Sequence, residues 1–322
     1  MSPKITVIGS ANIDYIMQME HLPSPGETVT DGTFAQAFGG KGANQALAAA
    51  QAGAKVSFVG ALGHDQTALD YKQSLEAHGI DCSQLSLEDE WPSGSAFVMI
   101  DRQGNNCISV AAGANAALSP ERVHAVEALM LQSDWIILQQ EIPQVSNQAV
   151  LAFAREHGLP VLLNYAPAHD LSLHLDAAVH GLVVNEIEAA DLLDQSFEPG
   201  DREAVLKLAE ALRRRGGHRF VAITLGAHGV VLSDAADCTY LPAFEVDAVD
   251  ATAAGDTFCG ALALALGEGQ SLPNAGRFAS AASALAVTQL GAQSSIPTRQ
   301  AIDAFLLSQK GTDAEGASDT RC

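Results

Sequence analysis

The sequence predicts an α/β protein, with a three-layer, doubly wound and mostly parallel sheet and a small β-sheet lid. Strand and helix patterns alternate over residues 56–60, 65–78 and 80 onward, which is typical of a parallel sheet flanked by helices. Two apolar runs, residues 94–101 and 106–111, interrupt this alternation, and the polar turn between them indicates a hairpin. This hairpin is the first sign of the lid.

We expect a single domain over residues 1–310, with a lid that is discontinuous in sequence. The lid consists of two excursions from the main sheet, roughly residues 11–36 and 94–112. Residues 96–100 are apolar on both faces, so one face covers the core or a cleft and the other is free to meet a second copy. We therefore expect a homodimer through the lid. Residues 311–322 are small and polar, and we expect a disordered tail there.

Composition and charge argue against several classes of protein. With 322 residues, 48% of them hydrophobic and 17% charged, the chain is long enough to bury a large core. The net charge of −21 argues against a nucleic-acid partner, because phosphate backbones require a basic surface. No apolar run reaches the roughly 18 residues of a membrane helix, and no signal peptide is present, so we expect no membrane partner and a cytoplasmic location. The dispersed cysteines indicate reduced thiols rather than structural zinc.

The first strand pattern, Ile5–Ile8, leads into a polar segment rather than a dinucleotide-binding loop. Gly9-Ser-Ala-Asn12 follows it instead of GxGxxG, which removes the main support for hydride transfer. The strand pattern continues through residues 13–19, with apolar side chains on one face and Asp14 on the other. Asp14 is therefore expected to face a cleft, although a solvated strand end would explain the same pattern.

The segment Gly39–Gln45 is a glycine-rich turn that opens a helix. It is not a P-loop, because neither Ser nor Thr follows Lys41. Glycines allow the backbone to approach a small polar ligand, and the Asn44 side chain offers both a donor and an acceptor. A plain tight turn would explain the glycines as well, and whether Lys41 faces a sugar or a phosphate stays open.

Two later segments place polar side chains directly after strand patterns. Glu141 follows the apolar run 135–140, at the kind of strand end where open α/β sheets bind ligands, although a solvated loop acid fits equally well. Asn185 and Glu188 follow another strand and are three residues apart, so both can face one point from the first turn of a helix. A capping box would explain that pair without a metal ion.

The segment 250–258, Asp-Ala-Thr-Ala-Ala-Gly-Asp-Thr-Phe, carries the strongest chemical signal. Residues 244–249 alternate like a strand, and residues 260–266 are apolar and free of proline, which predicts a buried helix. Residues 253–255 therefore lie at a strand-to-helix turn, where free backbone N–H groups favour a phosphate. Asp256 beside them can take a proton from an attacking hydroxyl, which suggests phosphoryl transfer to an alcohol. An acidic turn that caps its own helix is the alternative.

Together with Gly39–Gln45 and Pro25-Gly-Glu-Thr-Val29, this segment resembles the ribokinase family of sugar kinases. The similarity runs from about residue 5 to residue 306, and residues 39–45 and 112–120 look like ribokinase sequences rather than fructokinase or adenosine kinase ones. The resemblance implies a ribokinase-like fold and ATP-dependent phosphorylation of a sugar, D-ribose at O5, with Asp256 as the general base.

The resemblance also implies the residues of each site. The sugar is expected at Asn12, Asp14, Gly40, Lys41, Gly42, Asn44, Glu141 and Asp256. The catalytic turn with its anion hole comprises Ala253, Ala254, Gly255 and Asp256. ATP is expected at Asn185, Thr224, Gly226, Gly229, Gly255 and Ser280. Asn185 and Glu188 are expected to hold Mg²⁺ through water, and K⁺, a monovalent activator, is expected at Asp250, Thr252, Ala286, Gln289, Gly291 and Ser295.

Other readings remain open. Tyr165 stands where ribokinases usually carry proline, which leaves room for another substrate such as deoxyribose, a nucleoside or a ketose. A catalytically silent sugar-binding regulator would bind the sugar without releasing ADP, although Asp256 and its small-residue turn argue against it. A dehydrogenase is a distant third candidate, because the glycine fingerprint is missing.

Overall fold

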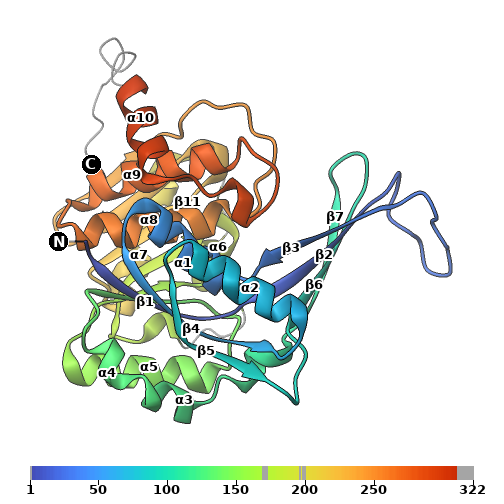
Figure 1. The fold of residues 1–322 in the computed structure, drawn as a ribbon. Coiled ribbons are helices and arrows are strands. Elements are labelled where there is room, and N and C mark those ends of the chain that lie inside the picture. Colours follow the sequence, from blue (N-terminus) through green and yellow to red (C-terminus); the bar gives the residue numbers. More distant parts are fainter. Residues whose placement is uncertain (1, 169–172, 196, 198–200, 310–322) are drawn as a thin grey trace.

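The computed structural model of the chain describes residues 2–168, 173–195, 197 and 201–309. These residues form a nine-stranded sheet and a separate four-stranded sheet (Figure 1). The order of strands in the large sheet is β13-β12-β11-β10-β9-β8-β1-β4-β5. Their bounds are β1 Lys4–Ile8, β4 Lys55–Gly63, β5 Asp81–Glu88, β8 Trp135–Leu138, β9 Val161–Asn164, β10 Val179–Asn185, β11 Phe220–Thr224, β12 Val230–Asp234 and β13 Cys238–Leu241.

The large sheet is parallel except at one edge, where β12 and β13 are antiparallel. Helices cover both of its faces. One face carries α1 Lys41–Ala52, α2 Gln66–Ala77, α8 Ala254–Gly267, α9 Leu272–Ala286 and α10 Arg299–Gln309. The other carries α3 Pro120–Ala125, α4 Glu127–Met130, α5 Gln144–His157, α6 Glu186–Leu193 and α7 Arg202–Gly216. The predicted three-layer, mostly parallel α/β fold is therefore confirmed.

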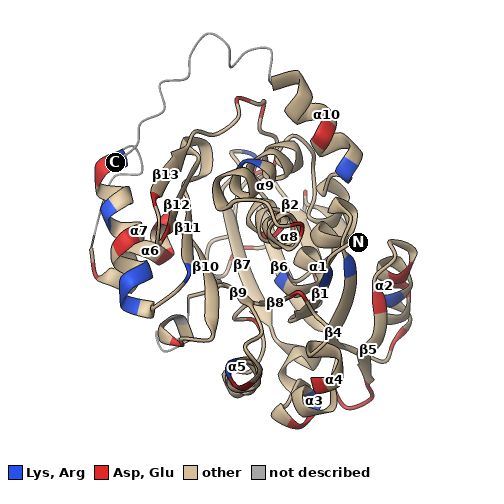
Figure 2. Cartoon of the chain, turned by 90° about the vertical axis from the view of Figure 1, so that its left-hand side faces the viewer, with Lys and Arg blue, Asp and Glu red and all other residues tan. Residues whose placement is uncertain are grey.

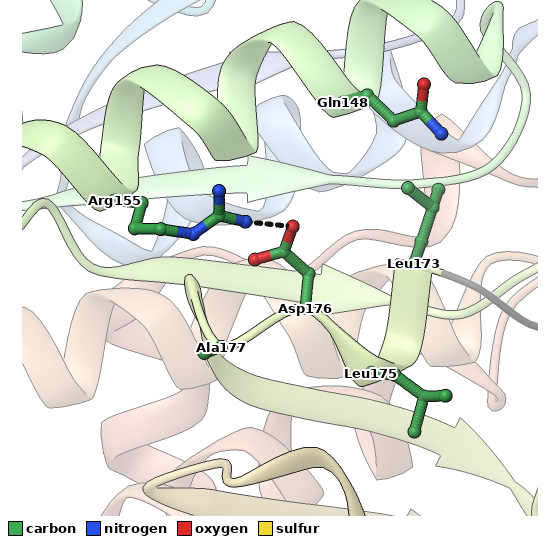
Figure 3. Close-up of a pocket in the computed structure, with 6 residues that line it drawn as sticks. All are labelled: Gln148, Arg155, Leu173, Leu175, Asp176 and Ala177. Atoms are coloured by element: carbon green, nitrogen blue, oxygen red, sulfur yellow. Dashed lines mark hydrogen bonds and ion pairs between the residues drawn. The ribbon is translucent and has the colours of Figure 1, made fainter.

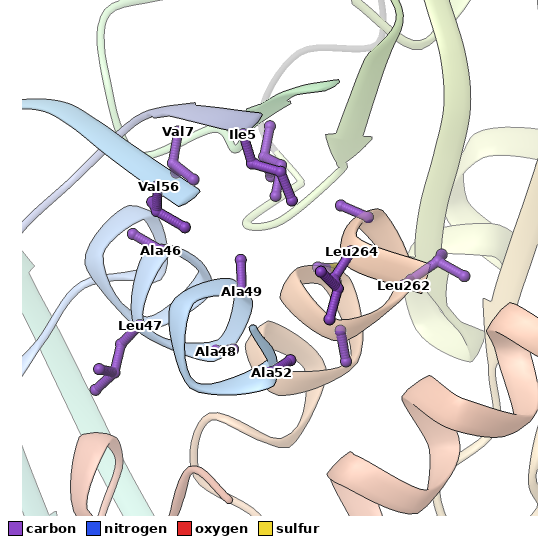
Figure 4. Packing of buried hydrophobic residues seen from close by; sticks show 14 of the residues in the cluster. Ile5, Val7, Ala46, Leu47, Ala48, Ala49, Ala52, Val56, Leu262 and Leu264 are labelled. Atoms are coloured by element: carbon purple, nitrogen blue, oxygen red, sulfur yellow. The ribbon is translucent and has the colours of Figure 1, made fainter. Parts of the chain in front are cut away.

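The strands divide their side chains between two hydrophobic cores. Val7 of β1 packs in the core under α1 and α8, whereas Ile8 packs in the core on the opposite face. This alternation follows from the period of two in a strand, and apolar residues at both phases are what a sheet buried on both faces requires. Figure 4 shows Ile5 and Val7 facing small residues of α1, such as Ala49, beside Leu264 of α8. The alanines allow α1 and α8 to lie close together.

The four-stranded sheet is the lid, and it projects from the body as a long ribbon (Figure 1). Its strands are β2 Asn12–Gln18, β3 Thr33–Gly39, β6 Gly94–Ile100 and β7 Asn106–Ala111, in the order β3-β2-β6-β7. The predicted hairpin is the antiparallel pair of β6 and β7. The first excursion runs three residues further than the predicted boundary at 36, because β3 stays paired with β2 as far as Gly39.

One predicted strand is wrong. Residues 244–249 alternate in sequence, but the structure has no strand there, and the chain runs as an irregular segment from β13 to the turn before α8. The alternation has a different cause. Phe244 and Val246 are half-buried, and Phe244 packs edge-on against Phe305 of α10 and under the guanidinium of Arg277. The predicted helix at 260–266 is the inner part of α8, which begins earlier, at Ala254.

Charged side chains gather on the outer helices, for example along α7 and α2, as Figure 2 shows. Among the described residues, no helix is both long and apolar enough to cross a bilayer. The predicted disordered tail, residues 311–322, lies outside the described residues.

Candidate active site

The turn before α8 places Asp256 at the centre of the candidate site. Ala253 is the N-cap of α8 and has left-handed backbone angles, with φ 59° and ψ 9°, a conformation that costs a residue with a Cβ roughly 1–2 kcal/mol. No side chain caps the first turn. A Cβ added to Gly255 would meet no atom within 4 Å, so the space beside this residue is open. The Ala254 N–H donates to the Ala251 carbonyl over 3.2 Å, so the N–H groups of Gly255 and Asp256 are the ones suited to an anion.

Asp256 is buried, and two amide side chains of α1 donate to its carboxylate. Asn44 Nδ2 donates to Oδ2 over 3.0 Å, and Gln45 Nε2 donates to Oδ1 over 2.9 Å. Burial raises the pKa of the Asp256 carboxyl, while the charge of Lys41 and the two amides lower it. A carboxylate that is desolvated and still hydrogen-bonded is a stronger base than one in water.

Close contact between α1 and α8 sets this geometry. A Cβ on Gly260 of α8 would lie 2.6 Å from the carbonyl oxygen of Gln45 and 2.7 Å from Cβ of Ala48, so only glycine allows this approach. Behind Asp256, the Gln45 amide also donates to Asn164 at the end of β9 over 3.1 Å, and it accepts from Gln139 over 2.8 Å. These bonds fix the Gln45 side chain and the carboxylate it contacts.

The first turn of α1 packs against the end of β1. Gly40 has φ 92°, and a Cβ there would lie 2.7 Å from the backbone nitrogen of Asn12. A Cβ on Gly42 would lie 2.5 Å from the nitrogen of Ser10. Glu141 holds the same corner, because its Oε2 accepts from the Ser10 hydroxyl over 2.5 Å and from the Lys41 backbone N–H over 3.0 Å. Both glycines are thus required by packing, whatever they bind.

Asp14 reaches the site from the lid strand β2. Burial raises its pKa to about 7, with additional repulsion from Glu141 and Asp256. A Cβ on Gly39 of β3 would lie 2.1 Å from Asp14 Oδ2, so the facing strand has made room for this carboxylate. Asp14 thus lies close to the other acids of the candidate site, and its orientation toward a cleft stays a prediction. Asn12 is also buried, and its Oδ1 accepts from Asn115 Nδ2 over 2.7 Å.

Lys41 is the cation among these acids. Burial alone would lower the pKa of its ammonium, but the charges of Asp256, Glu141 and Glu188 raise it above its ordinary value. Lys41 therefore stays protonated. The three carboxylates come from α8, the segment after β8 and α6, so the ammonium is influenced both by residues expected at the sugar and by one expected near the phosphates.

Asn185 and Glu188 form a complete capping box at the start of α6. Asn185 Oδ1 accepts from the Glu188 N–H, and Glu188 Oε2 accepts from the Asn185 N–H, each over 2.8 Å. The alternative reading of this pair as a helix cap is thus confirmed. Burial raises the pKa of Glu188. Only Oε1 of its carboxylate is left outside the box.

The segments around residues 250 and 291 form one oxygen-rich loop pair. Asp250 Oδ1 accepts from the Thr252 N–H over 2.9 Å and from its hydroxyl over 2.6 Å, while Oδ2 accepts from the Gly291 N–H over 2.9 Å. Partial burial raises the pKa of Asp250, but these hydrogen bonds outweigh it and lower the pKa overall. Ser283 of α9 donates to the Ala254 carbonyl over 2.8 Å, which ties α9 to the first residue of α8.

The remaining predicted nucleotide residues lie at the ends of β11 and along α9. Gly226 and Gly229 both have positive φ values, 53° and 105°. A Cβ on Gly229 would lie 2.1 Å from the Leu241 carbonyl oxygen, so its conformation is required by the turn itself. Thr224 donates to the Val184 carbonyl over 3.3 Å, which is a bond within the sheet. Ser280 is half-buried on α9.

Comparisons with known proteins now place the chain. The family model described as pfkB family carbohydrate kinase matches residues 2–299. The chain belongs to this family of carbohydrate kinases. It is 40% identical to the ribokinase of Haemophilus influenzae over 306 residues, which covers 95% of this chain and 99% of the relative. It is 31% identical to a deoxyribokinase of Salmonella typhi, over 94% of this chain and 98% of the relative.

A solved structure gives the same result. The structure of Arabidopsis thaliana ribokinase complexed with ribose and ATP superposes with a TM-score of 0.86 at 30% identity. The match covers 95% of this chain and 99% of that one. The predicted resemblance to the ribokinase family is therefore confirmed, and the chain is a phosphotransferase of the carbohydrate kinase type.

In this carbohydrate kinase, some residues around the site were not expected from the sequence. Gln45 donates to the Asp256 carboxylate, and Asn164 accepts from Gln45. Gln45 directly follows Asn44 in the glycine-rich segment, and Asn164 ends an apolar strand. Both residues could therefore have been predicted from their position in the sequence. Tyr71 and Gln293 belong to the same network but come from segments without a chemical pattern.

Two surface hollows of the kinase share no residue with this site. A hollow of about 390 Å³ is lined by residues of α5 and the segment 173–177, and the ion pair of Arg155 with Asp176 lies in it (Figure 3). A second hollow, of about 340 Å³, lies between the lid strand β3 and α2 and is lined by Gln36, Ala37, Phe38, Thr67 and Asp70. Neither has the buried acid and free amides of the turn at Asp256.

Proposed function

We propose that this kinase transfers the γ-phosphoryl group of ATP to O5 of D-ribose. The observation that carries the proposal is the position of the Asp256 carboxylate. It is buried in the first turn of α8, which has no side-chain cap, and two amide groups donate hydrogen bonds to it. The family of the chain and the ribokinases among its relatives supply the class of sugar and the nucleotide.

We assign the sugar to the space between the lid and the first turn of α1. Asp14 and Asn12 reach it from β2, and Asn44 reaches it from α1 beside the backbone of Gly40 and Gly42. Carboxylate and amide groups recognise sugar hydroxyls because each can hold a defined hydrogen-bond geometry. Glu141 is already engaged with Ser10 and the Lys41 N–H through one oxygen, so it offers the other.

The chemical step follows from the surroundings of Asp256. Its carboxylate takes the proton of the sugar hydroxyl as that oxygen bonds to the γ-phosphorus, and the bond to the β,γ-bridging oxygen breaks to release ADP. The N–H groups of Ala253, Gly255 and Asp256 stabilise negative charge on the transferred phosphoryl group, whereas the Ala254 N–H already donates to the Ala251 carbonyl. Lys41, protonated among three carboxylates, lies between the two substrates and is suited to the same task.

ATP is assigned to the ends of β10 and β11 and the facing part of α9. The residues in question are Asn185, Thr224, Gly226, Gly229, Gly255 and Ser280. Mg²⁺ would neutralise charge on the nucleotide phosphates. Because the capping box occupies most of the hydrogen-bonding capacity of Asn185 and Glu188, their donor set fits contact with Mg²⁺ through water rather than direct ligation.

The loop pair at Asp250 and Gly291 fits a monovalent cation. Its donor set consists of oxygens, namely the Asp250 carboxylate, the Thr252 and Ser295 hydroxyls and the carbonyls of Ala286, Gln289 and Gly291, which suits K⁺. When bound there, K⁺ would add positive charge behind the catalytic turn. Asp250 lies three residues before Ala253, so the loop pair is joined to that turn directly through the chain.

Replacement of the base tests the mechanism. We expect Asp256→Asn to fold and to bind ATP normally but to lose roughly 10²- to 10⁴-fold in turnover, because removal of a general base costs about that much. Coupled-assay kinetics with ribose and a nucleotide-binding titration would measure both. Asp247→Asn, an exposed change in the same region, is the matched control. Near-normal turnover of the Asp256 variant would remove the base assignment.

A second candidate is the same reaction on another sugar. The similarity to a deoxyribokinase favours 2-deoxyribose as the competitor. Tyr165 itself is fully buried in the core on the sheet face opposite α1 and α8. Purified protein with ATP and a panel of sugars, each with and without K⁺, separates the two. A higher kcat/KM for deoxyribose than for ribose would replace the assigned substrate, and sugar binding without ADP release would indicate a catalytically silent binding protein.

A further inference from the structure

Tyr71 of α2 holds the inner end of the lid. Its side chain is fully buried, and its hydroxyl donates to the Gly39 carbonyl at the end of β3 over 2.6 Å. Its ring stacks on Phe38, with the ring centroids 4.3 Å apart and the planes at 3°. Burial keeps the pKa of the Tyr71 hydroxyl well above its ordinary value, so the hydroxyl retains the proton that it donates.

Gln293 connects this anchor to the catalytic centre. It lies in the short 3₁₀ helix η4, Gln293–Ser295, which follows α9. Its Nε2 donates to the Tyr71 hydroxyl over 2.6 Å and to Asn44 Oδ1 over 3.2 Å. Asn44 in turn donates through Nδ2 to Asp256 over 3.0 Å. A continuous set of hydrogen bonds therefore runs from the lid strand to the catalytic acid.

The direction of these bonds is fixed by chemistry. A carboxylate only accepts, so Asn44 must turn its NH₂ group toward Asp256 and its carbonyl away. That carbonyl requires a donor, and the NH₂ group of Gln293 supplies one while its second hydrogen is given to Tyr71. If Gln293 were an acceptor at this place, the Asn44 amide would either lose its partner or rotate its oxygen toward the carboxylate, which is repulsive.

We propose that Gln293 and Tyr71 are positioning residues for the sugar: they set the orientation of the Asn44 amide and couple it to the end of lid strand β3. This inference rests on the proposed function, because it gives Asn44 a role in sugar binding. Neither residue contacts the sugar itself. Ordering of Asn44 by a bound sugar is transmitted to Gly39, and the position of the lid is transmitted to the sugar-binding amide.

Two variants test the relay through kinetics. Gln293→Glu has the same shape but only accepts at this position, and Tyr71→Phe keeps the ring stack but loses the hydroxyl. We expect each to raise the KM for ribose about tenfold or more, because a buried hydrogen-bonding group loses its partner, while the KM for ATP stays within about twofold. Calorimetric binding of ribose without nucleotide should weaken by a similar factor.

Gln132→Glu is the matched control, since Gln132 donates its amide to the Ala128 carbonyl at an exposed position outside the relay. A third measurement does not depend on the substrate. In the unliganded protein, Tyr71→Phe should speed amide hydrogen exchange over residues 33–39 about tenfold, because the strand end loses its anchor.

The outcomes separate the two claims. If the wild type phosphorylates ribose but both variants keep its KM for ribose and the exchange rate of residues 33–39 is unchanged, the relay is wrong. If the wild type phosphorylates no sugar of the panel, the proposed function fails, and the exchange measurement alone then decides whether Tyr71 anchors the lid. Equal increases in the KM for ribose and for ATP would also overturn a role specific to the sugar.

Discussion

Three carboxylates and one ammonium group meet at the site, and their burial has a cost in stability. Asp14 and Asp256 both have raised pKa values, because water is excluded from them and because they repel Glu141 and each other. Lys41 offsets part of this repulsion. An enzyme keeps such groups because the desolvated acids bind and activate the substrate, so a substitution that removes one can stabilise the fold and abolish function.

Asp14 allows this cost to be measured. Its pKa is about 7 in the folded chain and 3.8 ordinarily, so the folded state binds the proton more tightly. The resulting stability is present below pH 3.8 and is lost as the pH rises through about 7. We therefore expect Asp14→Asn to be more stable than the wild type at pH 8, by up to about 4 kcal/mol, with a smaller gain at pH 5.

Urea unfolding at both pH values, with and without the substitution, measures this gain. The variant should at the same time bind ribose poorly, because it loses a carboxylate of the sugar site. An equal change in stability at pH 5 and pH 8 would show that Asp14 titrates normally in the folded protein.

Among single residues, the sequence predicted those that stand in a recognisable motif of neighbouring residues. Asn44 and Asp256 stand in short motifs of glycine and small residues, where the chemistry can be read from neighbours in the chain. Tyr71 and Gln293 meet only because α2 and the segment after α9 converge on the end of β3. No local pattern marks either residue, because their hydrogen bonds join positions that are far apart in sequence.

Two helix N-termini, those of α1 and α8, define the site at the scale of elements. Each begins after a residue with positive φ, Gly40 and Ala253, whose own side chain makes no cap. Glycine is required at Gly40 because the backbone of Asn12, where β2 begins, lies against it. The first N–H groups of α1 are taken by Glu141 and Ser10, whereas no side chain caps the first turn of α8, so α8 is the helix start that suits a ligand.

The two glycines that flank α1 allow the cost of backbone strain to be separated from the cost of a steric contact. Gly40 and Gly53 both have positive φ, 92° and 115°, but an added Cβ would lie 2.7 Å from the Asn12 nitrogen at Gly40 and would meet nothing within 4 Å at Gly53. We expect Gly53→Ala to cost roughly 1–2 kcal/mol, from backbone strain alone. Gly40→Ala should cost more, and it should also raise the KM for ribose because the first turn of α1 must shift.

Chemical denaturation and sugar kinetics on both variants would check this. Gly53→Ala serves as the control, because Gly53 follows the C-terminal end of α1, far from the site. If the two variants lose the same stability and keep the same KM, the close approach of Gly40 to the Asn12 backbone at the start of β2 has no role in binding.

Strands and helices were predicted correctly where the pattern of apolar residues arises from burial against the large sheet. The alternation at residues 244–249 has the same appearance but arises from an irregular segment that packs single side chains against α10. Sequence periodicity reports which side chains are buried and not which backbone groups are paired, so it cannot separate a strand from an extended coil on a core. The Asn185 and Glu188 pair shows a related ambiguity, since a cap and a metal-site pattern share one spacing.

At the scale of the whole molecule, the lid has an aliphatic face, which comprises Ile16, Val98, Ile108, Ala96 and Val110. Ile16, Val98 and Ile108 are paired across β2, β6 and β7, so their side chains form one row. The neighbouring row on the same face is Asp14, Ala96 and Val110. The face that carries Asp14, which we assign to the sugar, therefore continues outward as an aliphatic surface. Ile108 and Val110 are each 55% exposed.

This continuity would place the predicted homodimer on the face that carries Asp14, and not on the opposite face expected from the sequence. An exposed aliphatic sheet face is unfavourable in water, and a second copy of the same face would cover it. We expect the wild type to have twice the chain mass in solution at micromolar concentration. Ile108→Asp should be monomeric, because it would bury a carboxylate in an apolar interface without a partner.

The same substitution should weaken ribose binding in the kinetic assay, because Ile108 and Asp14 lie in adjacent rows of one face and the loss of the partner lid would expose the sugar side to water. Leu307→Asp is the control: Leu307 is 67% exposed on α10, and its replacement should change neither mass nor KM. Light scattering decides the matter. A monomeric wild type, or an Ile108 variant that stays dimeric, would show that the aliphatic face serves a single lid closing over its own site.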